Sequence, residues 1–410
     1  MSDTRDERSA GEDATGTGAG APARGPLLAA VAALLLTAVA GAGLLVDGRG
    51  SSPSASDPTD AARPPAAPPV PATAASLPVG PPAPPDLSEA FRRAERVRPL
   101  SSLLVSQGGQ FLGGSYWRGL GPGEPVNVKS ASKSILGLLV GIAIEEGHVR
   151  SVDQPIREFF PGHYRRLDDP RKRLITVGNL LTMQAGLSTT SFDTYGAWAS
   201  SDDWIGFALR RDLECLPGRC WEYSTGNYHL LSALLTRATG VDTRSWAGRE
   251  LLGPLGIPAR PWDRGPDGYY LGGNNMSFTS RELLRIGEML LDDGRWEGEQ
   301  VVPERWIRQS WTPRVTSSYN GNGYGYGWWT RELAGERFWY AWGYGGQYLL
   351  LAPELDLAVV ATTAIGRTRR DFDADRSLFR ILREEIVPEV RRATVAAARG
   401  DGRVPAHRLR

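Results

Sequence analysis

Lysine is scarce in this chain of 410 residues, because only Lys129, Lys133 and Lys172 are lysines among its 47 basic residues. An amine can lose its proton near neutral pH and a guanidinium cannot, so each lysine is a candidate for chemistry. An excess of charge of one sign is also lacking, since 46 acidic residues nearly balance the basic ones. This balance argues against nucleic acid as a partner.

Histidine and cysteine are rare as well. The four histidines fall in unrelated contexts, and none forms a metal-binding pattern such as H-E-x-x-H, so neither a metal nor another cofactor is predicted. The two cysteines, Cys215 and Cys220, stand in ECLPGRC. Outside the cytoplasm this spacing predicts a short disulfide across a Pro-Gly turn, with two unpaired thiols as the alternative.

One long hydrophobic run, PLLAAVAALLLTAVAGAGLLV at 26–46, contains no charged residue. At about 1.5 Å per residue it reaches about 30 Å, which is enough to cross a bilayer. It predicts an uncleaved membrane anchor, with the polar tail 1–25 in the cytoplasm and the rest of the chain outside. Cleavage as a signal peptide near the stretch 38–40 is the alternative, and it would make the protein secreted.

The remaining chain divides into a spacer, a domain and a short tail. Residues 47–86 are rich in Pro and Ala and predict a disordered linker, because such a segment cannot bury a core. A globular domain is predicted over 87–397, followed by a flexible tail over 398–410.

Strand patterns stand at both ends of this domain and helical patterns in its middle. Residues 101–117 predict two strands around a Gly-Gly turn, and 338–363 return to strand character. Residues 130–146 predict a helix that is apolar all round, hence buried, and opened by a serine N-cap. Further helices are predicted over 226–238, 279–292 and 371–395. The expected fold is α+β: an antiparallel sheet of N- and C-terminal strands, flanked by helices, with an inserted mostly helical region.

Ser130 and Lys133 form an S-x-x-K pattern at the start of the buried helix. Side chains three positions apart share one helical face, so the amine can reach the hydroxyl. Burial lowers the pKa of an amine, and a neutral amine activates a serine as a nucleophile. The alternative is a plain helix cap at Ser130, with Lys133 in solvent.

Two further motifs could complete such a site. Tyr223, in YSTGNY, can carry a proton to a leaving group, while Asn227 in the same motif packs or caps nearby or contacts substrate. Adjacent glycines in GYGGQ, at 343–347, indicate close backbone approach within a strand, and an N–H there would join that of Ser130 in an oxyanion hole. The aromatic cluster at 324–329 is core packing or, alternatively, the lining of an apolar cleft.

Taken in order, S-A-S-K, PG…EYSTGNYHLL and GYGGQYLLLAPELDLAVV resemble the serine β-lactamase and penicillin-binding-protein superfamily over 95–390. The likeness is to its class C-like branch of esterases, D-amino-acid peptidases and 6-aminohexanoate-dimer hydrolase-like enzymes. ITVGNLLTMQAGL and GYGYGWW are also typical of that branch. The resemblance implies Ser130 as the acylated nucleophile, Lys133 as general base, Tyr223 as the tyrosine of Y-x-N, and Gln347 as donor of the second oxyanion N–H.

This sequence departs from the superfamily at two positions. Thr225 replaces the asparagine of Y-x-N, and Tyr344-Gly345-Gly346 replaces K-T-G, whose lysine and threonine help to hold the carboxylate of penicillin-type substrates. Arg367 or Arg369 could supply the missing charge.

The departures lower the expectation of β-lactamase or D-alanyl-D-alanine carboxypeptidase activity. The function expected is a membrane-tethered extracytoplasmic serine hydrolase that cleaves a small-molecule ester, amide or short peptide. A non-catalytic sensor or binding domain of the same fold is the alternative from another class.

Overall fold

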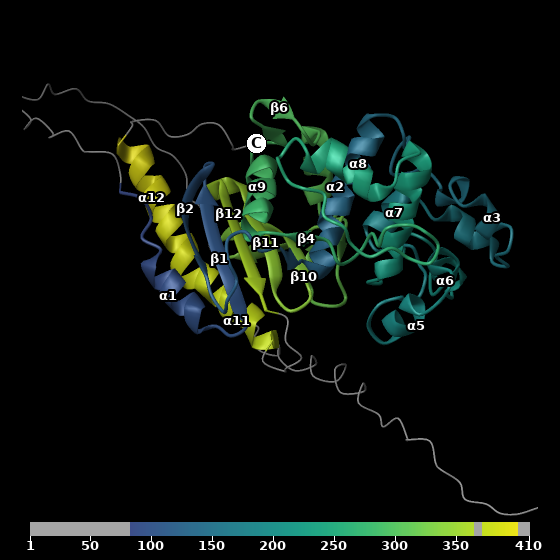
Figure 1. Ribbon diagram of the computed structural model, residues 1–410, viewed down its shortest axis with the longest axis horizontal. Coiled ribbons are helices and arrows are strands. Elements are labelled where there is room, and N and C mark those ends of the chain that lie inside the picture. Colours follow the sequence, from purple (N-terminus) through teal and green to yellow (C-terminus); the bar gives the residue numbers. More distant parts are fainter. Residues whose placement is uncertain (1–82, 365–370, 401–410) are drawn as a thin grey trace, which may run out of the picture. The chain divides into compact units, whose positions relative to one another are not determined.

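The computed structural model describes residues 83–364 and 371–400. An eight-stranded antiparallel sheet forms the centre of this part of the chain, in the order β2-β1-β12-β11-β10-β9-β8-β7 (Figure 1). Its strands are Leu100–Gln107 (β1), Gln110–Tyr116 (β2), Val315–Thr316 (β7), Gly323–Tyr324 (β8), Trp329–Leu333 (β9), Glu336–Gly343 (β10), Gln347–Ala352 (β11) and Leu357–Thr363 (β12). The predicted α+β fold, with N- and C-terminal strands in one antiparallel sheet, is confirmed.

Among the described residues, four two-residue strands lie outside the large sheet and form two pairs. Val126–Asn127 (β3) pairs with Ser277–Phe278 (β4), and Arg295–Trp296 (β5) pairs with Glu299–Gln300 (β6). The first of these pairs ties the segment before Ser130 to the segment that follows Gly273, and this brings two parts of the site together.

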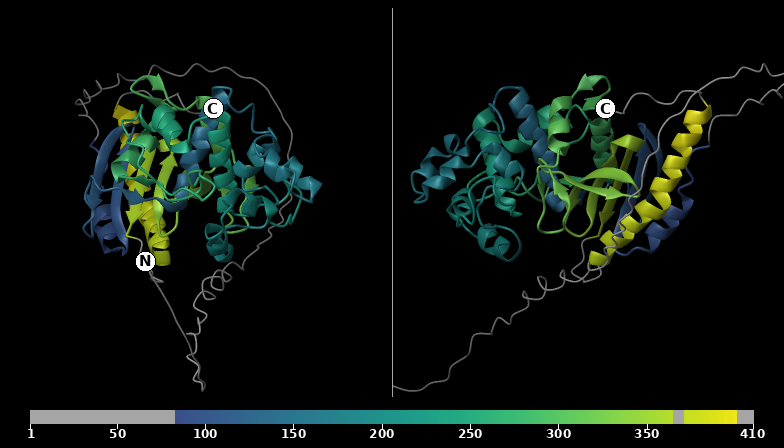
Figure 2. Two further views of the ribbon diagram at one scale, coloured as in Figure 1. Left: turned by 45° about the vertical axis from the view of Figure 1, so that its right-hand side comes forward. Right: turned by 180° about the vertical axis from the view of Figure 1, so that it is seen from behind.

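Helices flank the sheet on both faces. The α-helices of the described residues are Ser88–Arg96 (α1), Ser132–Glu145 (α2), Pro161–Tyr164 (α3), Val177–Leu181 (α4), Tyr195–Ala199 (α5), Trp204–Arg210 (α6), Thr225–Thr239 (α7), Thr243–Ala247 (α8), Ser280–Leu291 (α9), Glu304–Trp311 (α10), Asp371–Ile381 (α11) and Val387–Gly400 (α12). Seen from behind, α1 and α12 lie on the outer face of the sheet, and α9 packs on the opposite face (Figure 2). Strands β11 and β12 are buried along their whole length, because helices cover both of their faces.

The helical part of the chain, from α3 to α8, is inserted between β2 and β7 and packs around α7. Helix α2 joins the two parts, since it contacts both α7 and β10. Every residue from Ser132 to Ala143 is buried, as the apolar pattern predicts. The indole of Trp306 donates to the carbonyl of Gly137 at 3.0 Å and fills the space where a side chain at Gly141 would lie. These contacts fix α2, and with it the turn that carries Ser130.

The described residues contain no helix that is long and apolar enough to cross a membrane. The predicted anchor at 26–46, the linker before residue 83, and Arg367 and Arg369 lie outside the described residues.

Candidate active site

Ser130 lies in a short 3₁₀ turn, Lys129–Ala131, immediately before α2. The prediction that Ser130 is the N-cap is wrong: the cap position is Ala131, and no side chain caps the helix. Ser132 holds the turn instead, because its hydroxyl donates to the carbonyl of Lys129 at 2.6 Å and accepts from the N–H of Met276 at 3.1 Å. Neither of these bonds uses the hydroxyl of Ser130, which is therefore available to the side chains of the site.

The amine of Lys133 lies beside Ser130, with Nζ at 3.1 Å from Oγ. Its side chain is only 2% exposed, so it does not extend into solvent as a surface lysine would. Burial lowers the pKa of the amine from 10.5 to about 7. A substantial fraction of the amine is therefore neutral at neutral pH, and a neutral amine can accept a proton.

Two other oxygens complete the surroundings of this amine. Nζ lies 2.5 Å from the carbonyl oxygen of Gly273 and 3.5 Å from Oγ1 of Thr225. A neutral amine has two N–H donors and one lone pair. Donation to Gly273 and Thr225 uses both donors of the neutral amine, and its lone pair is then the group that can accept the proton of the Ser130 hydroxyl, whereas the protonated amine donates to that oxygen.

Thr225, the residue that departs from Y-x-N, is itself fixed by hydrogen bonds. Its Oγ1 lies 2.9 Å from the hydroxyl of Ser191, and that hydroxyl also accepts from the N–H of Thr225 at 2.9 Å. A hydroxyl at position 225 thus reaches the amine from the first turn of α7. The Y-x-N pattern identifies position 225 from the sequence alone. No sequence pattern identifies Ser191 as its partner or the carbonyl of Gly273 as a contact of the amine.

Tyr223 completes the group around Ser130, since the Ser130 side chain acts on its phenol and partly offsets the effect of burial on the pKa of that phenol. Its ring centroid lies 5.0 Å from Nζ of Lys133. Burial raises the pKa of the phenol above its usual value, so Tyr223 is protonated at neutral pH. In that state it can give a proton to a leaving atom and recover one from its neighbours. Ser130, Lys133 and Tyr223 therefore meet at one point, although Tyr223 is distant in sequence.

The β10–β11 hairpin lies against the Ser130 turn. Gly343 ends β10 with its Cα so near the carbonyl of Val128 that a Cβ would lie 2.0 Å from that oxygen. The prediction that GYGGQ lies within one strand is wrong, because Tyr344, Gly345 and Gly346 form the turn between β10 and β11. Both of these glycines have positive φ, at 82° and 99°. The tight turn, rather than an extended strand, accounts for the adjacent glycines.

Gln347 lies at the start of β11 and is fully buried. Its side-chain amide donates to the carbonyl and the hydroxyl of Thr363, at 3.1 and 2.8 Å, and its Oε1 accepts from the N–H of Thr363. Thr363 in turn donates to the carbonyl of Gly345. These bonds fix the hairpin turn, and the role of Gln347 as donor of an oxyanion N–H stays a prediction. Tyr344 is 57% exposed at the turn.

Other residues predicted for the site are packed in the interior, and Trp329 of the 324–329 cluster stacks on Tyr223 with centroids 6.2 Å apart. Asn227 is 4% exposed, and its amide contacts the sulfur of Met183 at 3.8 Å, so it packs beneath the site. The aromatic residues of the 324–329 cluster belong to the core. Cys215 and Cys220 form a disulfide that closes the loop before Trp221.

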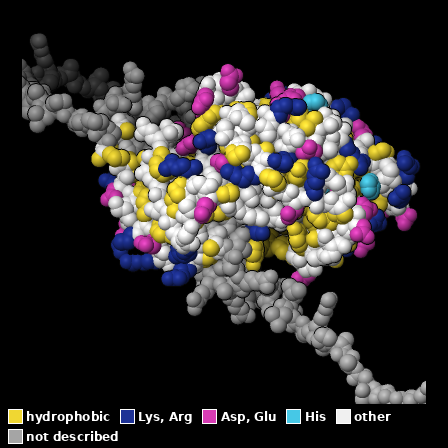
Figure 3. Space-filling view, viewed as in Figure 1, with side chains coloured by type: hydrophobic (Ala, Val, Ile, Leu, Met, Phe, Trp, Pro, Cys, Tyr) yellow, Lys and Arg dark blue, Asp and Glu magenta, His cyan; other side chains and the backbone are white. Residues whose placement is uncertain are grey.

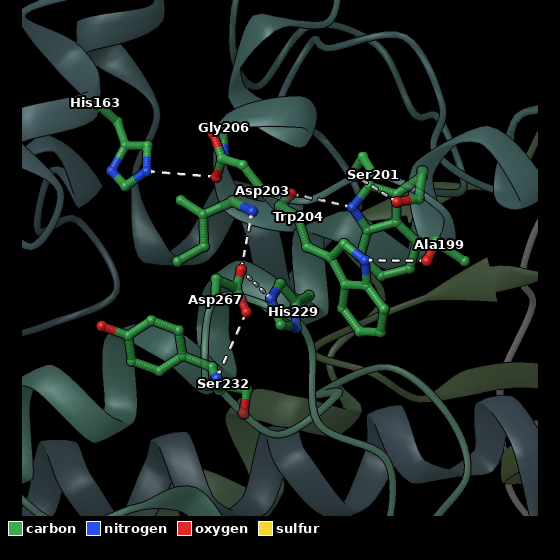
Figure 4. Close-up of polar contacts among 12 residues, drawn as sticks. His163, Ala199, Ser201, Asp203, Trp204, Gly206, His229, Ser232 and Asp267 are labelled. Carbon is green, nitrogen blue, oxygen red and sulfur yellow. Dashed lines mark hydrogen bonds and ion pairs between the residues drawn. The ribbon is translucent and has the colours of Figure 1, made fainter. Parts of the chain in front are cut away.

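A polar cluster next to α7 positions the loop that carries Gly273 (Figure 4). Asp267 accepts from the backbone N–H of Ile205 at 3.1 Å and lies 3.0 Å from Nε2 of His229. His229 is fully buried on α7, one turn after Thr225. The loop is thereby tied to the helix whose first turn contacts Lys133. No group of three potential metal ligands occurs among residues 83–364 and 371–400.

The sheet with its inserted helices, and the S-x-x-K turn beneath its hairpin, define a serine-hydrolase class of protein. The family model described as Beta-lactamase matches residues 88–382, and the chain belongs to this β-lactamase family. The 6-aminohexanoate-dimer hydrolase of Paenarthrobacter ureafaciens is 28% identical over 291 residues, which are 63% of this chain and 71% of that relative.

Two solved structures show the same fold. The octameric penicillin-binding protein homologue from Pyrococcus abyssi has a TM-score of 0.57 and 19% identity, and the match covers 72% of this chain and 77% of that one. The D-stereospecific amidohydrolase from Streptomyces sp. has a TM-score of 0.55 and 19% identity, over 71% of this chain and 98% of that one. At such identities the likeness concerns the fold alone.

Proposed function

We propose that this protein is a serine hydrolase that cleaves an ester or small amide through an acyl-enzyme on Ser130. The observation that carries the proposal is the buried amine of Lys133, with Nζ 3.1 Å from Oγ of Ser130 and a pKa of about 7. The partners of this amine among the described residues are uncharged oxygens, and a buried amine without an acidic partner is costly to keep in a purely structural role.

The geometry supports the following sequence of steps. Oγ of Ser130 bonds to the substrate carbonyl carbon while its proton passes to Nζ of Lys133. The bond from that carbon to the leaving oxygen or nitrogen then breaks, and the leaving group takes a proton from the hydroxyl of Tyr223, which recovers one from Nζ of Lys133, so that the amine is neutral again. Water next attacks the acyl carbon and gives its proton to the same amine. Ser130 leaves with that proton, and the carboxylic acid is released.

Charge at the site favours uncharged substrates over penicillin-type ones. Tyr344 stands where K-T-G has its lysine, and it is a solvent-exposed phenol without positive charge. Among the described residues of the hairpin turn, a substrate carboxylate would thus lack the cation that the superfamily's third motif supplies. Ester or small-amide hydrolysis is the first proposal, and β-lactamase or D-alanyl-D-alanine carboxypeptidase activity is the alternative.

A covalent probe tests the acyl-enzyme. A fluorophosphonate should label the wild type at one site per chain, and Ser130→Ala should abolish labelling. Ser245→Ala removes an exposed hydroxyl on α8 that is bonded to Asp242, and it serves as the matched control. Labelling that survives in Ser130→Ala would contradict the nucleophile. Labelling without turnover of any ester or amide would favour the sensor.

We also propose that the domain works outside the cytoplasm, tethered by the 26–46 segment. The disulfide between Cys215 and Cys220 supports this, because such bonds persist in oxidising compartments. Protease added to intact cells should degrade the domain of the full chain. Complete protection, with degradation only after lysis, would place the domain inside.

A further inference from the structure

We propose that Phe192 and Tyr319 bind the leaving group of the substrate, and that this leaving group is an uncharged aromatic or apolar alcohol or amine. The inference rests on the proposed function, because it uses Tyr223 as the group that protonates the leaving atom.

A continuous set of rings leads from the nucleophile to solvent. Tyr223, whose ring lies 5.0 Å from Nζ of Lys133, has its centroid 5.9 Å from that of Phe192. Phe192 stacks on Tyr319 with centroids 5.6 Å apart and planes at 26°. Phe192 is 55% exposed and Tyr319 40%, unlike the buried rings of the core. An apolar group that enters beside Ser130 from this side would cover both rings.

Phe192 is held in this position against its own backbone preference. Its φ is +52°, and a bulky residue with positive φ is a genuine outlier. The segment before it is fixed to the site, since Thr189 donates to the carbonyl of Tyr223 at 2.6 Å and Ser191 bonds to Thr225. Strained residues that the surroundings hold in place are concentrated at functional sites. The exposed ring and the strained backbone thus occur at one residue, whose ring packs against that of Tyr223.

The position of Tyr223 also indicates which part of the substrate lies against these rings. A proton donor must lie within hydrogen-bond reach of the atom that it protonates, so the rings packed against Tyr223 flank the leaving group rather than the acyl group. In the view of Figure 3, hydrophobic side chains gather in a hollow at the lower edge of the described surface, between the sheet and the helical part. An aromatic leaving group fits such an apolar wall.

Charge near these rings argues against an anionic leaving group. Burial, and after it the negative charge of Asp375, raises the pKa of the phenol of Tyr319. The same carboxyl lies behind the hairpin, where its Oδ1 is 3.4 Å from the position of a Cβ on Gly346. A leaving group with its own carboxylate, such as a terminal amino acid, would be repelled there.

Two substrate pairs test the inference with the full-length protein. Benzyl acetate and ethyl acetate differ in the alcohol, whereas ethyl phenylacetate and ethyl acetate differ in the acyl group, and a pH-stat follows the acid released. We expect kcat/KM about tenfold higher for benzyl acetate than for ethyl acetate, mainly through KM. Phe192→Ala and Tyr319→Ala should each reduce this ratio toward 1, and Phe192→Leu should keep part of it. Leu174→Ala, at a residue that is 59% exposed in another segment, should leave the ratio unchanged.

The outcomes separate this inference from the proposed function. If Ser130-dependent hydrolysis of ethyl acetate occurs but benzyl acetate is not preferred, the inference fails and the hydrolase stands. A preference in the acyl pair that depends on Phe192 would place the ring on the other side and also overturn it. If no ester is hydrolysed and no probe labels Ser130, the proposed function fails and takes the inference with it.

Discussion

The buried amine of Lys133 makes folding stability depend on pH in a defined direction. Its side chain is 2% exposed, and its pKa falls from 10.5 to about 7 in the folded protein. The unfolded chain exposes this amine, which then keeps its proton up to about pH 10.4. Between these two values the unfolded state holds one more proton than the folded state. The free energy of unfolding therefore rises with pH by about 1.4 kcal/mol per pH unit across this window.

Replacement of Lys133 by methionine removes this dependence and leaves a chain of similar length. Below about pH 7 both states of the wild type are protonated, so the folded state carries the whole cost of the buried charge, about 5 kcal/mol. Lys133→Met should thus have its greatest relative stability below pH 7. This advantage should shrink steadily as the pH rises toward 10.

Urea unfolding of both proteins at unit steps from pH 6 to about pH 10 measures the effect. The difference between the two free energies cancels the titration of every other group, and the lost bond to Gly273 adds only a constant offset. A difference that stays constant from pH 7 to 10 would show that the amine is charged in the folded protein. The general-base proposal would then lose its physical basis.

Three further predictions concern activity and the loop before the site. The kcat/KM for an uncharged ester should rise with pH with a midpoint near 7, as Lys133 loses its proton. Lys133→Arg should abolish activity, because guanidinium stays protonated, and an arginine variant with full rate would refute the assignment of Lys133 as general base. Thr225→Val should lower kcat about 10- to 100-fold with little change in KM, because one N–H of the Lys133 amine loses its acceptor, while Thr225→Asn should retain more activity. Equal rates for the valine variant and the wild type would show that the Thr225 hydroxyl does not orient the amine. Loss of the disulfide in Cys215→Ser/Cys220→Ser should cost about 2 kcal/mol of unfolding free energy, as expected for so short a loop, and denaturant unfolding with no shift would count against a stabilising role.

The local sequence pattern predicted strands and helices correctly where a segment is buried on all sides. The central strands β11 and β12 read as apolar runs, and α2 reads as a helix that is apolar on all sides. The hairpin at Gly345 and Gly346 was misplaced, because adjacent glycines indicate close approach and a tight turn equally well. Only the register of β10 against β11, with Gly343 opposite Gln347, decides between the two.

By itself the sequence indicated that Ser130 and Lys133 can meet, because side chains three positions apart on a helical turn share one face, and the structure places them in contact. The apolar pattern of 130–146 predicted that the lysine would be buried, but only the tertiary structure decided which groups surround its amine. The oxygens of Thr225 and Gly273 reach the amine from positions 92 and 140 residues further along the chain. Desolvation depends on how distant segments pack around a group, and no local pattern of residues encodes that packing.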